Sequence, residues 1–207
     1  MKIKLFLILF AVTLFANTQN YILNTSGLLD QRAVVKINQM ANEVKQKIGV
    51  NIYLDIKGDN GIKLELPMLE KIKQMKQIEK NLVKDLEKPY VLLTLAIDQH
   101  YSNILYEGIP KGSIDKDDIL DGYVIPLLAA KDKNLLKSKV SAAAFNGFAQ
   151  IADSLAETKN IKLETSIGSE GKTAGTIWKI FMYTIVLFGI IAYVVIIMRE
   201  KKYKGQK

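Results

Sequence analysis

Residues 90–98 read YVLLTLAID, a nearly continuous run of apolar side chains. Such a run predicts a central strand that is buried on both faces, as in a sheet covered by helices. Gln99 and His100 follow as a turn, and residues 101–106 are expected to form the neighbouring strand. These two strands are the expected centre of the fold.

The sequence before this centre predicts a helix and then a strand. Asp30 is a suitable N-cap and Gly49 a suitable C-terminal stop for the helix. Between them, apolar residues recur at spacings of three and four, which indicates one buried helix face; they are Val34, Ile37, Ala41, Val44 and Ile48. Residues 50–57 alternate between apolar and polar side chains, which predicts a half-buried strand.

Three further helices are expected, over residues 67–88, 115–130 and 134–157, the second interrupted near Gly122 and Pro126. In the helix over 67–88, the core face is expected to consist of Leu69, Ile72, Met75, Leu82 and Leu86. Its lysines, interleaved with Glu70, Glu79 and Glu87, are interpreted as a solvated face or, alternatively, as a patch for anionic lipid headgroups. Helices that alternate with buried strands predict an α/β fold, a three-layer α/β/α sandwich with a small central sheet.

The N-terminus has the layout of a secretory signal peptide. Residues 1–16 begin with Lys2 and Lys4, continue with the apolar run 5–15 and end at Ala16, a small residue suited to cleavage. As a helix, the apolar run would span roughly 16 Å, which is too short for a hydrocarbon core of about 30 Å. We therefore expect export of a domain over residues 17–157, with cleavage after Ala16.

The C-terminal part of the chain predicts a membrane anchor. Residues 180–198 carry no charge and would span about 28 Å as a helix, so a transmembrane helix is expected over 176–198. The polar segment 158–175 is expected to be a flexible linker. The basic tail 199–207 should be cytoplasmic by the positive-inside rule. These features predict a single-pass protein of the inner (cytoplasmic) membrane, with its N-terminal domain outside, in the periplasm.

The composition excludes several classes of site. The chain has 207 residues, a formal net charge of +8, no cysteine and one histidine. It therefore has no disulfide, no cysteine-bound zinc, no thiol nucleophile and no multi-histidine metal site. Only Arg32 and Arg199 among the 29 basic residues are arginines. Because arginine supplies most bidentate recognition of phosphates and bases, no nucleic-acid partner is expected.

One acidic cluster is a candidate metal site. It consists of Asp115, Asp117, Asp118 and Asp121. Hard cations such as Ca²⁺ prefer several carboxylate and carbonyl oxygens, although the spacing here is not that of an EF-hand loop. Alternatively, Asp115 caps a helix. His100 has no paired nucleophile or second ligand in the sequence, so no catalytic residue is expected.

The order of several segments resembles the TPM-domain family. The family opens with an apolar pair, Asp, two residues and Gly-Leu-Leu before a helix; here residues 22–29 read ILNTSGLL, with Asn24 where the family usually has Asp. The turn Tyr106–Gly108 stands where the family usually has a Gly-Tyr-Gly-like turn. The resemblance extends over residues 20–157 and includes three other segments, Val91–Leu93 with the Asp98 turn, Val124–Leu127 and the helix around Ser141–Ala152.

The resemblance implies an extracytoplasmic α/β/α domain in a membrane-anchored bacterial member. Members of the family have been linked to assembly or repair of complexes, to calcium binding and to weak phosphatase activity. We therefore expect an interaction module that assists the assembly, stability or repair of membrane protein complexes, with integral membrane proteins as partners and one helix in the lipid bilayer. The alternative is a Ca²⁺-binding domain or a phosphatase-like hydrolase with its site near Asp115–Asp121.

Overall fold

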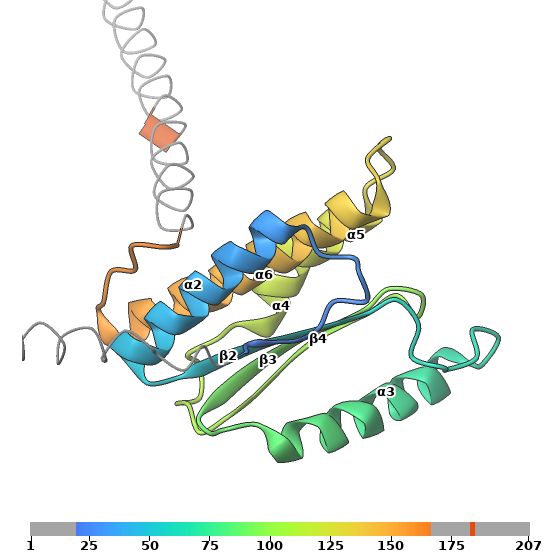
Figure 1. Cartoon of the computed structure of the whole chain (residues 1–207), viewed down its shortest axis with the longest axis horizontal. Helices are drawn as coiled ribbons and strands as arrows, with labels where there is room; N and C mark the ends of the chain where they lie inside the picture. The colour runs from blue at the N-terminus through green and yellow to red at the C-terminus, as the bar shows by residue number, and fades with distance from the viewer. Residues whose placement is uncertain (1–19, 167–182, 185–207) are drawn as a thin grey trace, which may run out of the picture. The chain divides into compact units, whose positions relative to one another are not determined.

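The computed structural model describes residues 20–166 and 183–184. Four strands form one mixed sheet in the order β1–β2–β3–β4 (Figure 1). They are β1 (Ile22–Asn24), β2 (Asn51–Lys57), β3 (Tyr90–Ala96) and β4 (Tyr101–Glu107). β1, β2 and β3 run parallel, and β4 runs antiparallel to β3. The expected central strand and its neighbour are thus confirmed.

Helices cover both faces of this sheet. Figure 1 shows α2 and α6, with the short α4 and α5, on one face and α3 on the other. The helices are α2 (Gln31–Ile48), α3 (Met68–Leu82), the 3₁₀ turn η2 (Val83–Asp85), α4 (Lys116–Ile119), the π-helical turn η3 (Leu120–Val124), α5 (Ile125–Ala129) and α6 (Leu136–Lys159). The predicted α/β class is confirmed, and the interruption predicted near Gly122 corresponds to η3.

Local signals set the ends of α2 where the sequence predicts them. The Asp30 carboxylate accepts a hydrogen bond from the Arg32 N–H at 2.8 Å. Gly49 ends the helix with φ of 83°, a left-handed conformation that glycine adopts without strain. The N–H of Asp30 also donates to Ser141 Oγ at 2.8 Å, which ties the start of α2 to α6.

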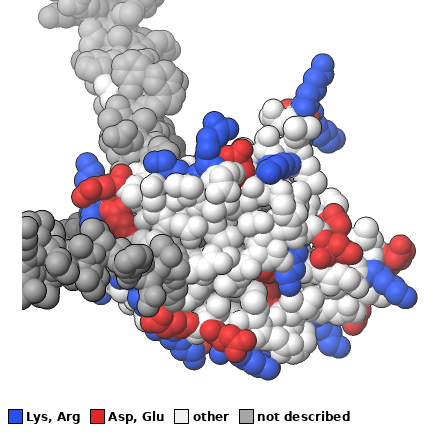
Figure 2. Space-filling view, in the orientation of Figure 1, with Lys and Arg blue, Asp and Glu red and all other residues white. Residues whose placement is uncertain are grey.

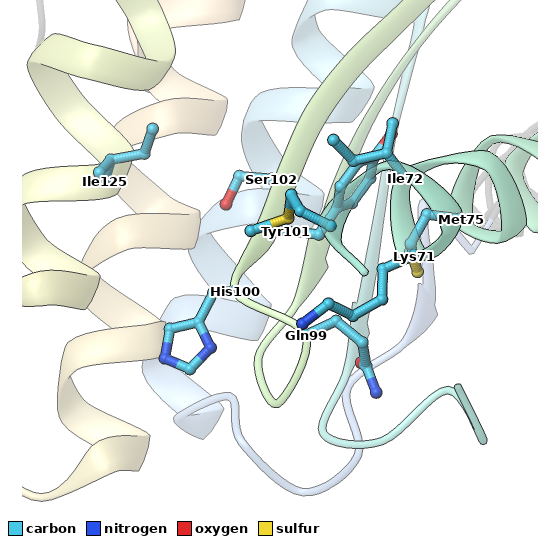
Figure 3. A pocket seen from close by; sticks show the side chains of 9 residues that line it. Lys71, Ile72, Met75, Gln99, His100, Tyr101, Ser102 and Ile125 are labelled. Carbon is cyan, nitrogen blue, oxygen red and sulfur yellow. The ribbon is translucent and has the colours of Figure 1, made fainter. Parts of the chain in front are cut away.

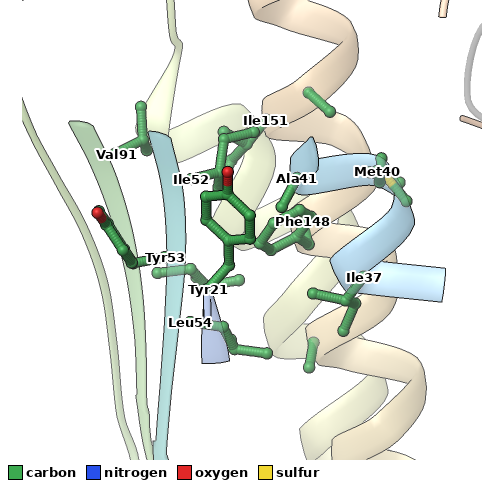
Figure 4. Packing of buried hydrophobic residues seen from close by; sticks show 14 of the residues in the cluster. Tyr21, Ile37, Met40, Ala41, Ile52, Tyr53, Leu54, Val91, Phe148 and Ile151 are labelled. Carbon is green, nitrogen blue, oxygen red and sulfur yellow. The ribbon is translucent and has the colours of Figure 1, made fainter. Parts of the chain in front are cut away.

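The main core lies between the sheet and the pair α2 and α6. Figure 4 shows Ile37 of α2 and Phe148 of α6 facing Ile52 and Leu54 of β2, with Tyr53 on the other side of the strand. Burial of these aliphatic and aromatic side chains stabilises the fold by roughly 1.5–3 kcal/mol each.

The prediction of a half-buried β2 is wrong. Six of its seven residues are buried, including the polar Asn51 and Asp55. The reason is that α3 covers the face of the sheet that the alternating pattern assigns to solvent.

Helix α3 also differs from its prediction. It ends at Leu82 and continues only as the turn η2, rather than running to residue 88. Leu69, expected in the core, is 82% exposed, whereas Glu79, expected in solvent, is 1% exposed. Met75 and Glu79 lie one helical turn apart and share the helix face that is turned to the sheet. This face does not include Leu69.

The flexible linker is predicted from residue 158, but the folded domain extends beyond that residue. Helix α6 extends to Lys159, and Leu163 beyond it is 5% exposed. The Glu43 carboxylate of α2 accepts hydrogen bonds from the N–H of Glu164 at 2.8 Å and from the N–H of Thr165 at 2.9 Å. Residues 158–166 therefore belong to the folded domain, and residues 167–175 lie outside the described part of the chain.

No helix within residues 20–166 or 183–184 is long and apolar enough to cross a membrane. The expected signal peptide 1–16 and basic tail 199–207 lie outside the described residues. So does the expected transmembrane helix over 176–198, apart from Tyr183 and Thr184. These two residues are helical and belong to a second unit over 167–207.

Candidate functional site

The turn between β3 and β4 lies at the edge of the sheet where the parallel strands end. Ligands of open α/β sheets usually bind outside this edge. Gln99 of the turn is buried and joins it to the loop after β2. Its Nε2 donates to Asp59 Oδ1 at 3.1 Å and to the Ile62 carbonyl at 3.3 Å. These bonds fix the turn in place.

His100 occupies the last position of this turn. Its backbone N–H donates to the Ile97 carbonyl at 3.1 Å, and its φ of 49° is left-handed. The side chain is exposed, as the sequence predicts, and Figure 3 shows it beside the start of β4.

Two hollows flank the start of β4. The first, which we call the α3-side hollow, has a volume of about 330 Å³, and the second, the α5-side hollow, about 440 Å³. Both are lined by His100, Tyr101, Ser102 and Ile125. The α3-side hollow adds Met68, Lys71, Ile72, Met75 and Gln99, and the α5-side hollow adds Ala96, Ile97, Leu128, Ala129 and Leu136. In Figure 3, Ser102 lies toward Ile125, whereas Tyr101 lies toward α3.

The rim of the hollows is apolar and open to solvent. Met68 is 57% exposed, Ile125 is 43% exposed and Leu136 is 49% exposed. The lining includes the cationic Lys71 and the imidazole of His100, but no carboxylate. This surface suits an apolar side chain with a carboxylate next to it.

A polar layer lies beneath α3, next to the α3-side hollow. Glu79 Oε2 accepts hydrogen bonds from the Tyr101 hydroxyl at 2.9 Å and from Asn103 Nδ2 at 2.8 Å. Cross-strand register places Thr94 beside Asn103, and Asp55 on the other side of Thr94. The three strand residues therefore share the face that α3 covers.

Burial perturbs the groups of this layer. It raises the pKa of the Asp55 carboxyl, against the opposing effect of Lys57. Burial, with the nearby Glu79 carboxylate, raises the pKa of Tyr101 well above its ordinary value. The hydroxyl of Tyr101 therefore stays protonated and keeps donating to Glu79. The layer attaches α3 to β4 and so fixes one wall of the α3-side hollow.

One of the four predicted metal ligands, Asp115, caps a helix in the structure. Asp115 Oδ1 accepts a hydrogen bond from the Asp118 N–H at 3.1 Å and so caps α4, which was the alternative interpretation. Asp115, Asp117, Asp118 and Asp121 are all exposed. In residues 20–166, no three His, Cys, Asp or Glu side chains come together as a group that could hold a metal ion. The structure therefore does not gather these aspartates into a ligand set.

Asn24, which stands at the family's usual Asp position, closes a local turn. Its Oδ1 accepts a hydrogen bond from the Ser26 N–H at 2.9 Å. This is the role that Asn and Asp share in turns.

The sequence interpretation missed both Glu79 and the hollows. A signal for Glu79 exists, because Ile72, Met75 and Glu79 follow one another at spacings of three and four and so share a helix face. The hollows have no such signal, because β4, α3 and α5 meet only in the tertiary structure.

Comparison with known proteins supports the fold alone. No family model and no curated protein matches the chain. A solved structure, the N-terminal domain of a protein from P. gingivalis determined by solution NMR, matches with a TM-score of 0.52 and 14% identity. The match covers 72% of this chain and 90% of that one. At this identity it indicates a shared architecture and carries no information about a ligand.

Proposed function

We propose that this chain is a TPM-like interaction module, a three-layer α/β/α domain that binds integral membrane proteins and assists the assembly, stability or repair of their complexes. In this proposal the segment 176–198 anchors the domain in the inner membrane, the domain lies in the periplasm, and the tail 199–207 is cytoplasmic. The sequence pattern supports the anchor, and the order of strands and helices supports the family resemblance.

The observation that carries the proposal is the exposed apolar rim of the two hollows. Large apolar side chains are exposed on α3, α5 and α6 around one end of the sheet. Contiguous apolar surface rimmed by polar residues is typical of a protein interaction site. Figure 2 shows acidic and basic side chains interleaved along the margins of the visible face. That interleaving favours a solvated face for the lysines of α3 over a patch for anionic lipids.

The test is capture of membrane proteins by the full chain in mild detergent. Ile125→Ser should reduce the recovered partners, because it removes apolar surface shared by both hollows. Val35→Ser is the matched control, because Val35 is 46% exposed, close to the 43% of Ile125, but lies on α2 away from the hollows. Equal recovery with the two variants, or with an unrelated domain on the same anchor, would contradict the proposal.

The location has its own test. Protease added to intact spheroplasts should degrade the domain and leave the tail 199–207 protected. Protection of the domain together with loss of the tail would reverse the proposed orientation.

A further inference from the structure

We propose that two copies of this chain associate through the outer edge of β4, forming one continuous eight-stranded sheet about a two-fold axis at Ile104. This edge adjoins the hollows of the contact with membrane proteins proposed above, but the pairing uses the backbone groups of β4 and not the apolar rim. β4 lies at the edge of the four-stranded sheet, and all seven of its residues pair with β3 in an unbroken register. It contains no proline, lysine or arginine, which commonly protect edge strands from pairing.

The hydrogen bonds between β2 and β3 show which way each backbone group of β3 points. The Asn51 N–H donates to the Pro89 carbonyl at 2.9 Å, and the Ile97 N–H donates to the Lys57 carbonyl at 2.9 Å. Odd-numbered residues of β3 are therefore directed at β2. Since successive residues of a strand alternate in direction, the even-numbered residues of β3 are directed at β4.

The same alternation applies to β4. Ala96 of β3 is the register partner of Tyr101, so odd-numbered residues of β4 bond to β3. The N–H and C=O groups of Ser102, Ile104 and Tyr106 consequently point away from the sheet, along its outer edge. Within the described residues, no other strand pairs with this edge.

An antiparallel pairing centred on Ile104 matches these outward groups to one another. Ser102 then lies opposite Tyr106 of the second copy, and Ile104 lies opposite its own equivalent. Each opposed pair exchanges two backbone hydrogen bonds, so three pairs supply about six bonds between the copies. A shift by one residue would oppose outward groups with groups already bonded to β3, and the bonds would be lost.

The side chains are compatible with this pairing. Glu107 is the one charged residue of β4 and lies opposite Tyr101 of the second copy, so no like charges meet. On the other face, Tyr106 of the second copy lies beside Ser102, at the hollows whose rim includes the exposed Ile125. The second copy thereby covers apolar surface that a single copy exposes to water.

Cysteine cross-linking tests the register directly, because the natural chain has no cysteine. Full-length chains with two different tags, one carrying Ser102→Cys and the other Tyr106→Cys, are expressed together in bacterial membranes and mildly oxidised. The opposed Cα atoms would be about 5.5 Å apart, within the range of a disulfide. We expect a cross-linked pair containing both tags. Ser102→Cys chains alone should not cross-link, because four residues of offset separate those positions by about 13 Å.

A second variant tests the edge without a cross-link. Ser102→Pro removes an N–H that points outward, so no bond to β3 is lost, and proline is tolerated on edge strands. It should leave the circular dichroism spectrum of the full chain unchanged, because each copy still folds, and weaken dimerisation about tenfold or more, because two symmetry-related interface bonds disappear. Sedimentation of the full chain in mild detergent measures this change.

Three results would overturn the proposal. They are no cross-link between the folded Ser102→Cys and Tyr106→Cys chains, a natural dimer that Ser102→Pro leaves intact, and cross-linking of Ser102→Cys only to a different protein. The last result would mean that the edge receives a foreign strand. A failure of the proposed membrane-protein contact is distinguished from these results, because capture is compared between the Ile125→Ser and Val35→Ser chains and uses neither the Ser102 nor the Tyr106 variants.

Discussion

Replacement of Gly147 by alanine has two opposing effects of similar size on the free energy of unfolding, a gain in helix propensity and a steric overlap in the core. Gly147 lies inside α6, where alanine is preferred over glycine by about 1 kcal/mol. However, a Cβ atom at this position would lie 2.6 Å from Val124 Cγ2 and 3.2 Å from Leu93 Cδ2. Both neighbours are fully buried, one in the π-helical turn η3 and the other in β3, so neither can move away freely.

The contact with Val124 should decide the outcome. Extra atoms in a packed core cost about 1–3 kcal/mol, and the distance of 2.6 Å is closer than any real contact of a Cβ atom. We expect Gly147→Ala to lower the free energy of unfolding by about 1–2 kcal/mol after the gain in helix propensity. Urea denaturation of the full chain in mild detergent, followed by circular dichroism, measures the change.

Two further variants make the prediction specific. Gly122→Ala is the matched control, because a Cβ there meets nothing within 4 Å; its stability should be unchanged or higher by up to about 1 kcal/mol. Val124→Ala combined with Gly147→Ala should be more stable than the sum of the single changes predicts, since the added methyl group occupies the space of the removed ones. A Gly147→Ala chain as stable as the natural one would refute the reasoning.

Three other predictions concern the ends of helices. At Glu43, burial raises the pKa of the carboxyl, but hydrogen bonds from Lys47, Thr165 and the backbone outweigh it and lower the pKa to about 2. Glu43→Gln should therefore cost about 1–2 kcal/mol at neutral pH. The pKa of the Glu43 carboxyl in the folded chain lies below its ordinary value of 4.5. The loss of unfolding free energy caused by Glu43→Gln should therefore be complete above pH 4.5 and disappear as the pH falls toward 2. Thermal melts that show the full loss at pH 2 would contradict this. Leu163→Ala should cost about 2–3 kcal/mol and expose residues 160–166 to limited proteolysis, whereas an unchanged cleavage pattern would mean that this segment is not held. Asp115→Ala should cost about 1 kcal/mol through the lost cap, and calorimetry should detect no Ca²⁺ heat with either chain; a saturable heat abolished by the substitution would restore the metal site.

Local signals made part of the fold predictable. The helix α2 begins and ends where Asp30 and Gly49 indicate, because caps are made by residues that are neighbours in the sequence. The apolar run of β3 also predicts its burial on both faces, because side chains that point to both sides of the strand are apolar.

Tertiary contacts explain the failures. The bonds from Glu164 and Thr165 to Glu43 join residues more than 120 positions apart, so the polar composition of 158–166 gives no sign of them. Likewise, the charged residues Asp55 and Glu79 are expected on the surface from the sequence alone, because their burial depends on the packing of α3 against the sheet. The aspartates near residue 115 are close in sequence, but the short helix that Asp115 caps leaves all four exposed to solvent.

The polar layer beneath α3 also disfavours a shifted register between β2 and β3. If β2 slid by one residue along β3, every side chain of the strand would change sides. Asp55 would then leave the polar layer beside Thr94 and enter the apolar layer of Ile37 and Phe148, where a buried carboxyl group is unfavourable. The buried position of Asp55 thus favours the observed register of β2 over the register shifted by one residue.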